Sequence, residues 1–230
     1  MTTGADSASG RALVVAVDGP SGSGKSTVAR RVAALLGYLY LDTGAMYRAV
    51  GVLAAETGVS PDDEAAVVAV AETAHLRFDG DGRLHAGDRD LSEAIRTLEA
   101  GELASRVSAL PGVRRLLVEQ QRAMARERGV VMEGRDIGTN VFPTAAVKVF
   151  LTAEPRVRAE RRLRELQAAG ADVTLDDVLA SVLARDRRDE ERAVAPLRRA
   201  DDAVEVDTTT MTLDKVVAEV ESIARGRLGL

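Results

Sequence analysis

A glycine-rich segment between an apolar run and an amphipathic stretch constrains this chain more than any other feature. Ala12 to Asp18 is a continuous apolar run of strand length, and a stretch of helical period follows from Lys25 to Leu36. The intervening Gly19-Pro-Ser-Gly-Ser-Gly24-Lys25-Ser26 has the glycine spacing and the Gly-Lys-Ser ending of a P-loop. This strand, loop and helix in that order predict an α/β domain that binds a nucleoside triphosphate.

Each part of the loop has a physical task in phosphate binding. Glycines let backbone N–H groups turn inward, and the helix that starts at Lys25 adds its dipole to the same anion site. Lys25 is predicted to place a charge on the β- and γ-phosphates, and the Ser26 hydroxyl to bind Mg²⁺. The alternative is a plain turn with a solvated Lys25, but chance matches to the P-loop pattern are rare at a strand–helix junction. The predicted ATP-binding residues are Gly19, Pro20, Ser21, Gly22, Ser23, Gly24, Lys25, Ser26 and Thr27.

Strand-like and helical segments alternate along the rest of the chain, which predicts a doubly wound parallel sheet with flanking helices. Residues 75–91 break this rhythm and predict a small antiparallel insertion around a tight turn. Ser60 with Pro61 is expected to start the helix that precedes this insertion. We expect residues 1–11 to be a disordered tail and 12–230 to be one domain. The other predicted strands are 38–41, 130–132, 146–151 and 203–206, and the other helices 45–56, 113–128, 154–169, 175–188 and 213–225.

Composition excludes several classes of function. The chain has no cysteine, which rules out disulfides, zinc–thiolate sites and cysteine nucleophiles. A net charge of −5 argues against a nucleic-acid polymer as partner, but not against a small anion. No apolar run is long enough to span a membrane, and the N-terminus does not resemble a signal peptide. We expect a cytoplasmic monomer that binds neither membrane nor nucleic acid.

Cationic side chains follow two of the predicted strands. Asp42-Thr-Gly-Ala-Met-Tyr-Arg48 follows the second strand, and Gly134-Arg-Asp-Ile-Gly-Thr139 follows a later one. Ligands bind at the carboxyl ends of such strands. Arg48 and Arg135 can therefore grip a phosphate through their forked guanidinium groups, and Thr43 and Tyr47 offer hydroxyls to it. A solvated helix face is the alternative for Arg48.

These two segments, together with Arg192-Ala-Val-Ala-Pro-Leu197, closely resemble the bacterial cytidylate kinases, from about Leu13 to the C-terminal helix. The resemblance implies the P-loop nucleoside monophosphate kinase fold, with a five-stranded parallel sheet, a small antiparallel insertion and a lid. It implies phosphoryl transfer from ATP, with Mg²⁺, to CMP or dCMP. It also implies a monophosphate-binding subdomain at residues 60–110.

By resemblance, Ser105, Arg114 and Asp136 recognise cytosine. An acid that accepts from the N4 amino group, beside donors to N3 and O2, complements the edge of this base. In their own right Ser105 and Arg114 are unremarkable helix residues. Glu133, just before Gly134, is a weaker candidate for ordering Mg²⁺.

Residues 185–199 are dense in both arginine and acid, and are predicted to form a lid over the phosphates. By resemblance Arg185 and Arg192 contact the monophosphate, Asp189 the sugar, and Arg188 the transferring phosphoryl group. Lys25, Arg185 and Arg188 are thus the predicted catalytic residues, although the division of work among the arginines stays open. A solvated helix with ion pairs between successive turns is the alternative.

Two rival functions stay open. The first is a P-loop kinase for another small acceptor, such as a different nucleotide or a non-nucleotide alcohol. An alcohol would need a carboxylate base close to it, whereas a phosphate acceptor is already anionic. A regulatory nucleotide binder would not turn over with any acceptor. A GTPase switch would need an Asn-Lys-x-Asp segment, which the sequence lacks.

Overall fold

The computed structural model describes residues 13–126, 128–168 and 170–230, so the expected tail at 1–11 lies outside the described residues. Its centre is a five-stranded parallel sheet in the order β2-β6-β1-β7-β8. The predicted parallel sheet is therefore confirmed, with β1 in the middle beside β6 and β7. The strands are β1 (Val14–Asp18), β2 (Leu39–Asp42), β6 (Val130–Gly134), β7 (Val147–Thr152) and β8 (Val204–Asp207).

Both faces of this sheet are covered, which explains why β1 is apolar throughout. Val15 and Val17 pack with α1 (Lys25–Leu36) and α8 (Leu213–Leu228) on one face. Val14 and Ala16 pack on the other face, against α5 (Pro111–Met124) and a π-helical turn, η2 (Ile137–Val141). Among the described residues, none of the helices is both long enough and apolar enough to cross a bilayer.

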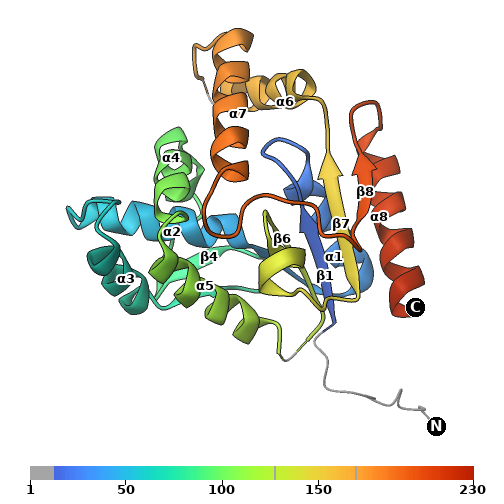
Figure 1. The fold of residues 1–230 in the computed structure, drawn as a ribbon, viewed down its shortest axis with the longest axis horizontal. Helices are drawn as coiled ribbons and strands as arrows, with labels where there is room; N and C mark the ends of the chain where they lie inside the picture. The colour runs from blue at the N-terminus through green and yellow to red at the C-terminus, as the bar shows by residue number, and fades with distance from the viewer. Residues whose placement is uncertain (1–12, 127, 169) are drawn as a thin grey trace.

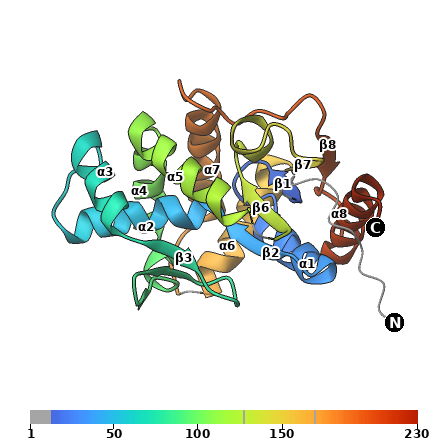
Figure 2. The ribbon, with the colours of Figure 1, turned by 90° about the horizontal axis from the view of Figure 1, so that it is seen from below.

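A subdomain with its own apolar core lies beside the sheet, between β2 and α5. Figure 2 shows it at one end of the molecule, with α1 and α8 at the other end. Its three short strands form the predicted antiparallel sheet, in the order β3-β4-β5. The elements are α2 (Thr43–Glu56), α3 (Glu64–Thr73), β3 (Leu76–Phe78), β4 (Leu84–Ala86), β5 (Arg89–Asp90), the 3₁₀ turn η1 (Ala94–Arg96) and α4 (Leu98–Val107).

The predicted start of α3 at Ser60 is wrong. Asp63 caps the helix instead, by accepting a hydrogen bond from the Ala66 N–H at 3.1 Å. Ser60 begins a separate turn, in which its carbonyl accepts from the Asp63 N–H at 3.0 Å. Ser and Asp are both good caps, and the sequence offered one of each three residues apart.

The last two helices before β8 form a hairpin that rises beyond the carboxyl edge of the sheet (Figure 1). It consists of α6 (Pro155–Ala168) and α7 (Leu175–Glu190), and a capping box at Thr174 starts α7. Ala159, Val178 and Val182 form a small apolar core between the two helices, separate from the cores of the sheet. The predicted lid at 185–199 comprises the end of α7 and the irregular chain after it.

Candidate active site

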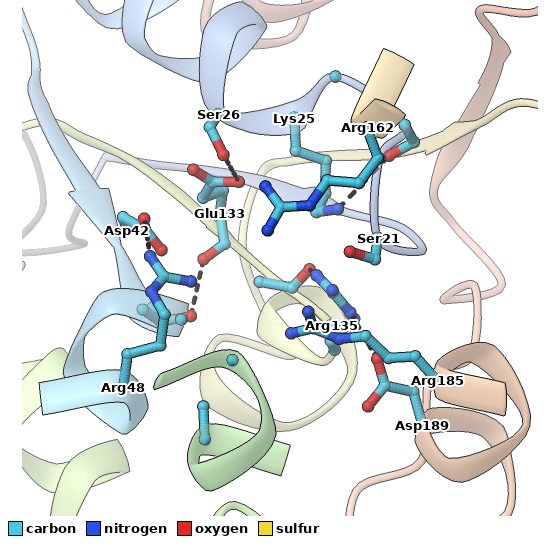
Figure 3. A pocket seen from close by; sticks show the side chains of 18 of the residues that line it. Ser21, Lys25, Ser26, Asp42, Arg48, Glu133, Arg135, Arg162, Arg185 and Asp189 are labelled. Carbon is cyan, nitrogen blue, oxygen red and sulfur yellow. Dashed lines mark hydrogen bonds and ion pairs between the residues drawn. The ribbon is translucent and has the colours of Figure 1, made fainter. Parts of the chain in front are cut away.

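A cavity of about 960 Å³ opens at the carboxyl edge of the sheet. The P-loop, the start of α2, the end of β6, and the helices α4, α6 and α7 all contribute to its walls. Figure 3 shows that charged side chains from these separate segments point into one space. The cavity thus joins the predicted donor site to the predicted acceptor site.

Close packing at one end and backbone conformation at the other hold the P-loop in shape. A Cβ on Gly19 would lie 2.0 Å from the Leu151 carbonyl oxygen, so only glycine fits against β7. Gly24 is the N-cap of α1 with φ +92°, a left-handed conformation that glycine adopts without strain. Gly19 and Pro20 lie behind the cavity wall, while residues 21–27 line it. The backbone is therefore set for anion binding before any nucleotide arrives.

Lys25 is folded back onto this loop and is only 5% exposed. Its Nζ donates to the Pro20 carbonyl at 2.6 Å and to Ser23 Oγ at 3.4 Å. Burial, and then the neighbouring Arg135, lower the pKa of Lys25 to about 7. Without a phosphate, this ammonium is thus stabilised much less than in water.

ATP binding at pH 8 is expected to take up roughly one proton, because the phosphates restore the charge of a Lys25 that is mostly neutral beforehand. Calorimetry of ATP binding in two buffers of different ionisation enthalpy measures this uptake, and Lys25→Met should abolish it. An uptake that persists in the variant would assign the proton elsewhere.

The unfolded chain holds the Lys25 proton up to about pH 10.5, whereas the folded chain releases it near pH 7. The free energy of unfolding should therefore rise with pH across that window.

Glu133, at the end of β6, connects three hydroxyl groups around the P-loop. Ser26 Oγ donates to Glu133 Oε2 at 3.0 Å, the Tyr40 hydroxyl donates to Oε1, and Thr43 Oγ1 donates to the Glu133 carbonyl at 2.7 Å. Burial, and then the nearby Asp42, raise the pKa of Glu133 above its usual range. A carboxylate with this environment gains from a cation, so the pair Ser26 and Glu133 suits a divalent metal beside the phosphates.

A buried carboxylate, which sequence reasoning did not single out, joins the P-loop strand to the acceptor loop. Asp18 accepts the N–H groups of Ile137 at 2.9 Å and Gly138 at 2.7 Å. These donors lie in η2, directly after Arg135 and Asp136. Burial raises the pKa of Asp18 to about 6, and the two N–H groups oppose that rise. Asp18 therefore fixes the position of Arg135 and Asp136 relative to the P-loop.

Three arginines converge on the middle of the cavity (Figure 3). Arg48 Nη2 is paired with Asp42 at 2.7 Å, and Arg135 Nε is paired with Asp189 at 2.9 Å. Burial, and then the charge of Arg135, lower the pKa of Arg185 to about 10. So many cations in one place repel one another until an anion arrives, which is the expected state of an empty phosphate site.

The predicted cytosine residues all line the cavity. Arg114 Nη2 is paired with Asp136 in a buried contact, and its guanidinium carbon lies 5.6 Å from the centre of the Tyr47 ring. Ser105 lines the same wall, and Arg192 donates to Ser108 Oγ at 3.3 Å. The structure thus brings a carboxylate, a guanidinium and a hydroxyl together, from α4, α5 and the residues after β6.

Comparison with known proteins identifies the family. The family model for cytidylate kinase matches residues 15–225. The chain belongs to the cytidylate kinase family. The cytidylate kinase of Geobacter sulfurreducens is 48% identical over 94% of both chains, and that of Syntrophotalea carbinolica is 49% identical over the same shares. That of Methylococcus capsulatus is 47% identical over 92% of this chain and 96% of its own.

Among the solved structures that this cytidylate kinase family member resembles, one has a TM-score above 0.5. An uncharacterized protein from Eubacterium ventriosum has a TM-score of 0.51 with 11% identity, over 94% of this chain and 99% of its own. A gluconokinase from Sinorhizobium meliloti covers 94% of this chain with 18% identity and a TM-score of 0.48. The family membership therefore rests on the sequence relatives, and the P-loop kinase fold on the sheet described above.

All of the predicted substrate-binding residues of this family member line the cavity: Thr43, Tyr47, Arg48, Ser105, Arg114, Arg135, Asp136, Arg185, Asp189 and Arg192. Arg188 does not. Its side chain is exposed, and its Nε donates to the Ala184 carbonyl of its own helix at 3.4 Å. The assignment of Arg188 to the transferring phosphoryl group stays a prediction, and in this conformation the residue is outside the cavity wall.

Arg162, by contrast, was missed by sequence reasoning and lines the cavity. It comes from α6 and reaches into the same space as Lys25 (Figure 3). Its Nη1 is paired with Glu165 at 2.9 Å, on a part-exposed helix face. Five arginines occur in α6, at 156, 158, 161, 162 and 164, and their spacing does not distinguish the two that line the cavity, Arg161 and Arg162.

Proposed function

We propose that this protein transfers the γ-phosphoryl group of ATP to CMP or dCMP, giving ADP and CDP or dCDP. One observation carries the proposal: a single cavity is lined by the P-loop, by a group of arginines and by the Arg114–Asp136 pair. This combination suits a nucleoside monophosphate whose phosphate is bound by the arginines near ATP and whose base is bound by the Arg114–Asp136 pair. Membership of the cytidylate kinase family supports the choice of base.

The chemistry needs positioned charge more than proton transfer. An anionic oxygen of the acceptor phosphate attacks the γ-phosphorus of ATP, and the bond from that phosphorus to the β,γ-bridging oxygen breaks, so ADP leaves with the electron pair. Arg48 and Arg135 hold the acceptor phosphate, while Lys25, Arg162 and Arg185 stabilise charge on the group in transfer. No general base is required for this acceptor.

The pairing of the carboxylates favours a phosphate acceptor over an alcohol. Asp42, Asp136 and Asp189 are each engaged by an arginine. Burial acts to raise the pKa of Asp189, yet Arg135 and Arg185 hold it below its usual range. Glu133 is bonded to the hydroxyls of Ser26 and Tyr40. A base for an alcohol would have to give up one of these partners.

We propose Mg²⁺ as the metal of this reaction, held by Ser26 with Glu133 beside it. Their mutual bond at 3.0 Å and the raised pKa of Glu133 support this assignment. The ion supplies positive charge to the β- and γ-phosphates when it is bound. Lid closure, a monomeric state and a cytoplasmic location stay predictions from the sequence.

CMP and dCMP are expected to be the best acceptors in a panel of nucleoside monophosphates, with UMP weaker and purine monophosphates poor. Asp136 accepts from the N4 amino group of cytosine, whereas uracil presents an acceptor there. ADP formation with ATP and Mg²⁺ measures turnover for each acceptor. Good turnover of AMP with no turnover of CMP would contradict the assignment of CMP as the substrate, but not the assignment of a kinase activity. ATP binding without turnover of any acceptor would favour a regulatory binder.

A further inference from the structure

A buried arginine of α6 connects three segments of the chain that meet behind the P-loop. Arg158 is 4% exposed and does not line the cavity. Its Nε donates to the Ala153 carbonyl at 2.9 Å, its Nη1 to the Ser21 carbonyl at 3.0 Å, and its Nη2 to Asp186 Oδ2 at 2.6 Å. One rigid guanidinium thus joins the residue after β7, the P-loop and α7.

The bond to Ser21 has a direct consequence for the phosphate site. In a trans peptide the C=O and N–H groups point in opposite directions. By holding the Ser21 carbonyl outward, Arg158 turns the N–H of Gly22 the other way, toward the cavity that Gly22 lines. In the described part of the chain, that N–H donates to no acceptor. It is therefore available for a phosphate oxygen.

Packing at this point is close enough to fix the geometry. A Cβ on Gly22, where φ is +76°, would lie 3.1 Å from the Cβ of Arg158 and 3.2 Å from its carbonyl oxygen. The loop thus rests directly on the first turn of α6. Small displacements of α6 will be felt by the Gly22 peptide.

The bond to Asp186 extends this connection to the lid. Asp186 is buried, and it lies next to Arg185 and three residues before Asp189, both of which line the cavity. Because α6 and α7 share a small apolar core, they form one hairpin, and Arg158 is the point at which this hairpin holds the P-loop.

We propose that Arg158 is a positioning residue for phosphoryl transfer, which orients the Gly22 N–H toward the donor phosphates. This role rests on the proposed function, since it assigns the P-loop to ATP. It predicts that loss of Arg158 harms ATP binding far more than CMP binding.

The test is the binding of each nucleotide alone, by calorimetry. Arg158→Met should weaken ATP binding about tenfold, as expected for one lost charge-assisted hydrogen bond, and leave the Kd of CMP nearly unchanged. Arg156→Met is the matched control, because Arg156 is exposed on the same helix and pairs with Glu160. The control should bind ATP as the unchanged protein does. Equal weakening of ATP and CMP binding by Arg158→Met would overturn the proposal.

A second comparison separates positioning from stability, because Arg158→Met leaves Asp186 buried without its partner and lowers the Tm. The double variant Arg158→Met with Asp186→Ala removes both charges and should regain Tm. Its ATP binding should stay as weak as that of Arg158→Met, since the Ser21 carbonyl still lacks its donor. Asp186→Asn keeps that donor, so its ATP affinity should stay within about twofold of the unchanged protein.

If ATP affinity instead recovers with Tm in the double variant, or falls in Asp186→Asn as far as in Arg158→Met, the positioning role is wrong. ATP binding is measured without acceptor. A protein that binds ATP but does not phosphorylate CMP would thus disprove the proposed function. The effect of Arg158 on ATP binding could still be measured in that protein.

Discussion

Lys25→Met is expected to lower kcat by at least about 10²-fold, because the transferring phosphoryl group loses a cation in a water-poor site. The Tm should stay the same or rise. Lys25 is buried in the ligand-free protein with its pKa lowered to about 7, so the folded state gains by losing that charge. Steady-state kinetics and thermal unfolding of the same preparation measure the two effects.

Lys215→Met is the matched control, since Lys215 is exposed in α8 and lies outside the cavity. It should leave kcat unchanged. If Lys25→Met retains turnover and weakens only ATP binding, the P-loop lysine holds the donor in its ground state without contributing to the transfer.

Arg185→Met is expected to lower kcat by about 10²-fold while raising the Tm of the ligand-free protein. Burial and the charge of Arg135 already lower the pKa of Arg185 to about 10, and the Nε of Arg185 has no hydrogen-bond partner among the described residues. The buried charge of this guanidinium thus destabilises the ligand-free protein, and it becomes stabilising only when phosphates are bound. Saturating ATP and CMP should reverse the order of the two Tm values.

Arg187→Met tests whether any arginine of this helix would give the same result. Arg187 is exposed two residues away and does not line the cavity, so kcat and Tm should both stay close to those of the unchanged protein. A fall in Tm for Arg185→Met would mean that Arg185 is held by favourable contacts even without substrate, which contradicts the repulsion described here.

Local patterns predicted the centre of the fold, the P-loop and the two arginines that follow strand ends. The P-loop frame located β1 and α1, because a buried strand and an amphipathic helix have different periods on either side of it. Arg48 and Arg135 were predicted because each follows a strand end, and parallel strands bring their ends to one edge. Ser105 and Arg114 came only through resemblance, since their own segments read as ordinary helix.

Arg158, Arg162 and Asp18 were not predicted, for a shared physical reason. Each acts through a neighbour that is distant in sequence: Ser21 for Arg158, the cavity for Arg162 and η2 for Asp18. Arginines every three or four residues on a helix read as a solvated face until the helix is placed against the P-loop. Arg188 shows the converse, because a position three residues from Arg185 still faces solvent.

The separate apolar core of the α6–α7 hairpin bears on how this protein can vary. Ala159, Val178 and Val182 pack with one another and not with the sheet, so the outer part of the hairpin contributes little to the stability of the domain. Insertions, deletions or a graft at the turn between the two helices should leave the sheet folded, and change only how the cavity is closed. Differences in chain length among relatives should therefore concentrate at this turn. The first turn of α6, which Arg158 fixes, should be free of insertions and deletions.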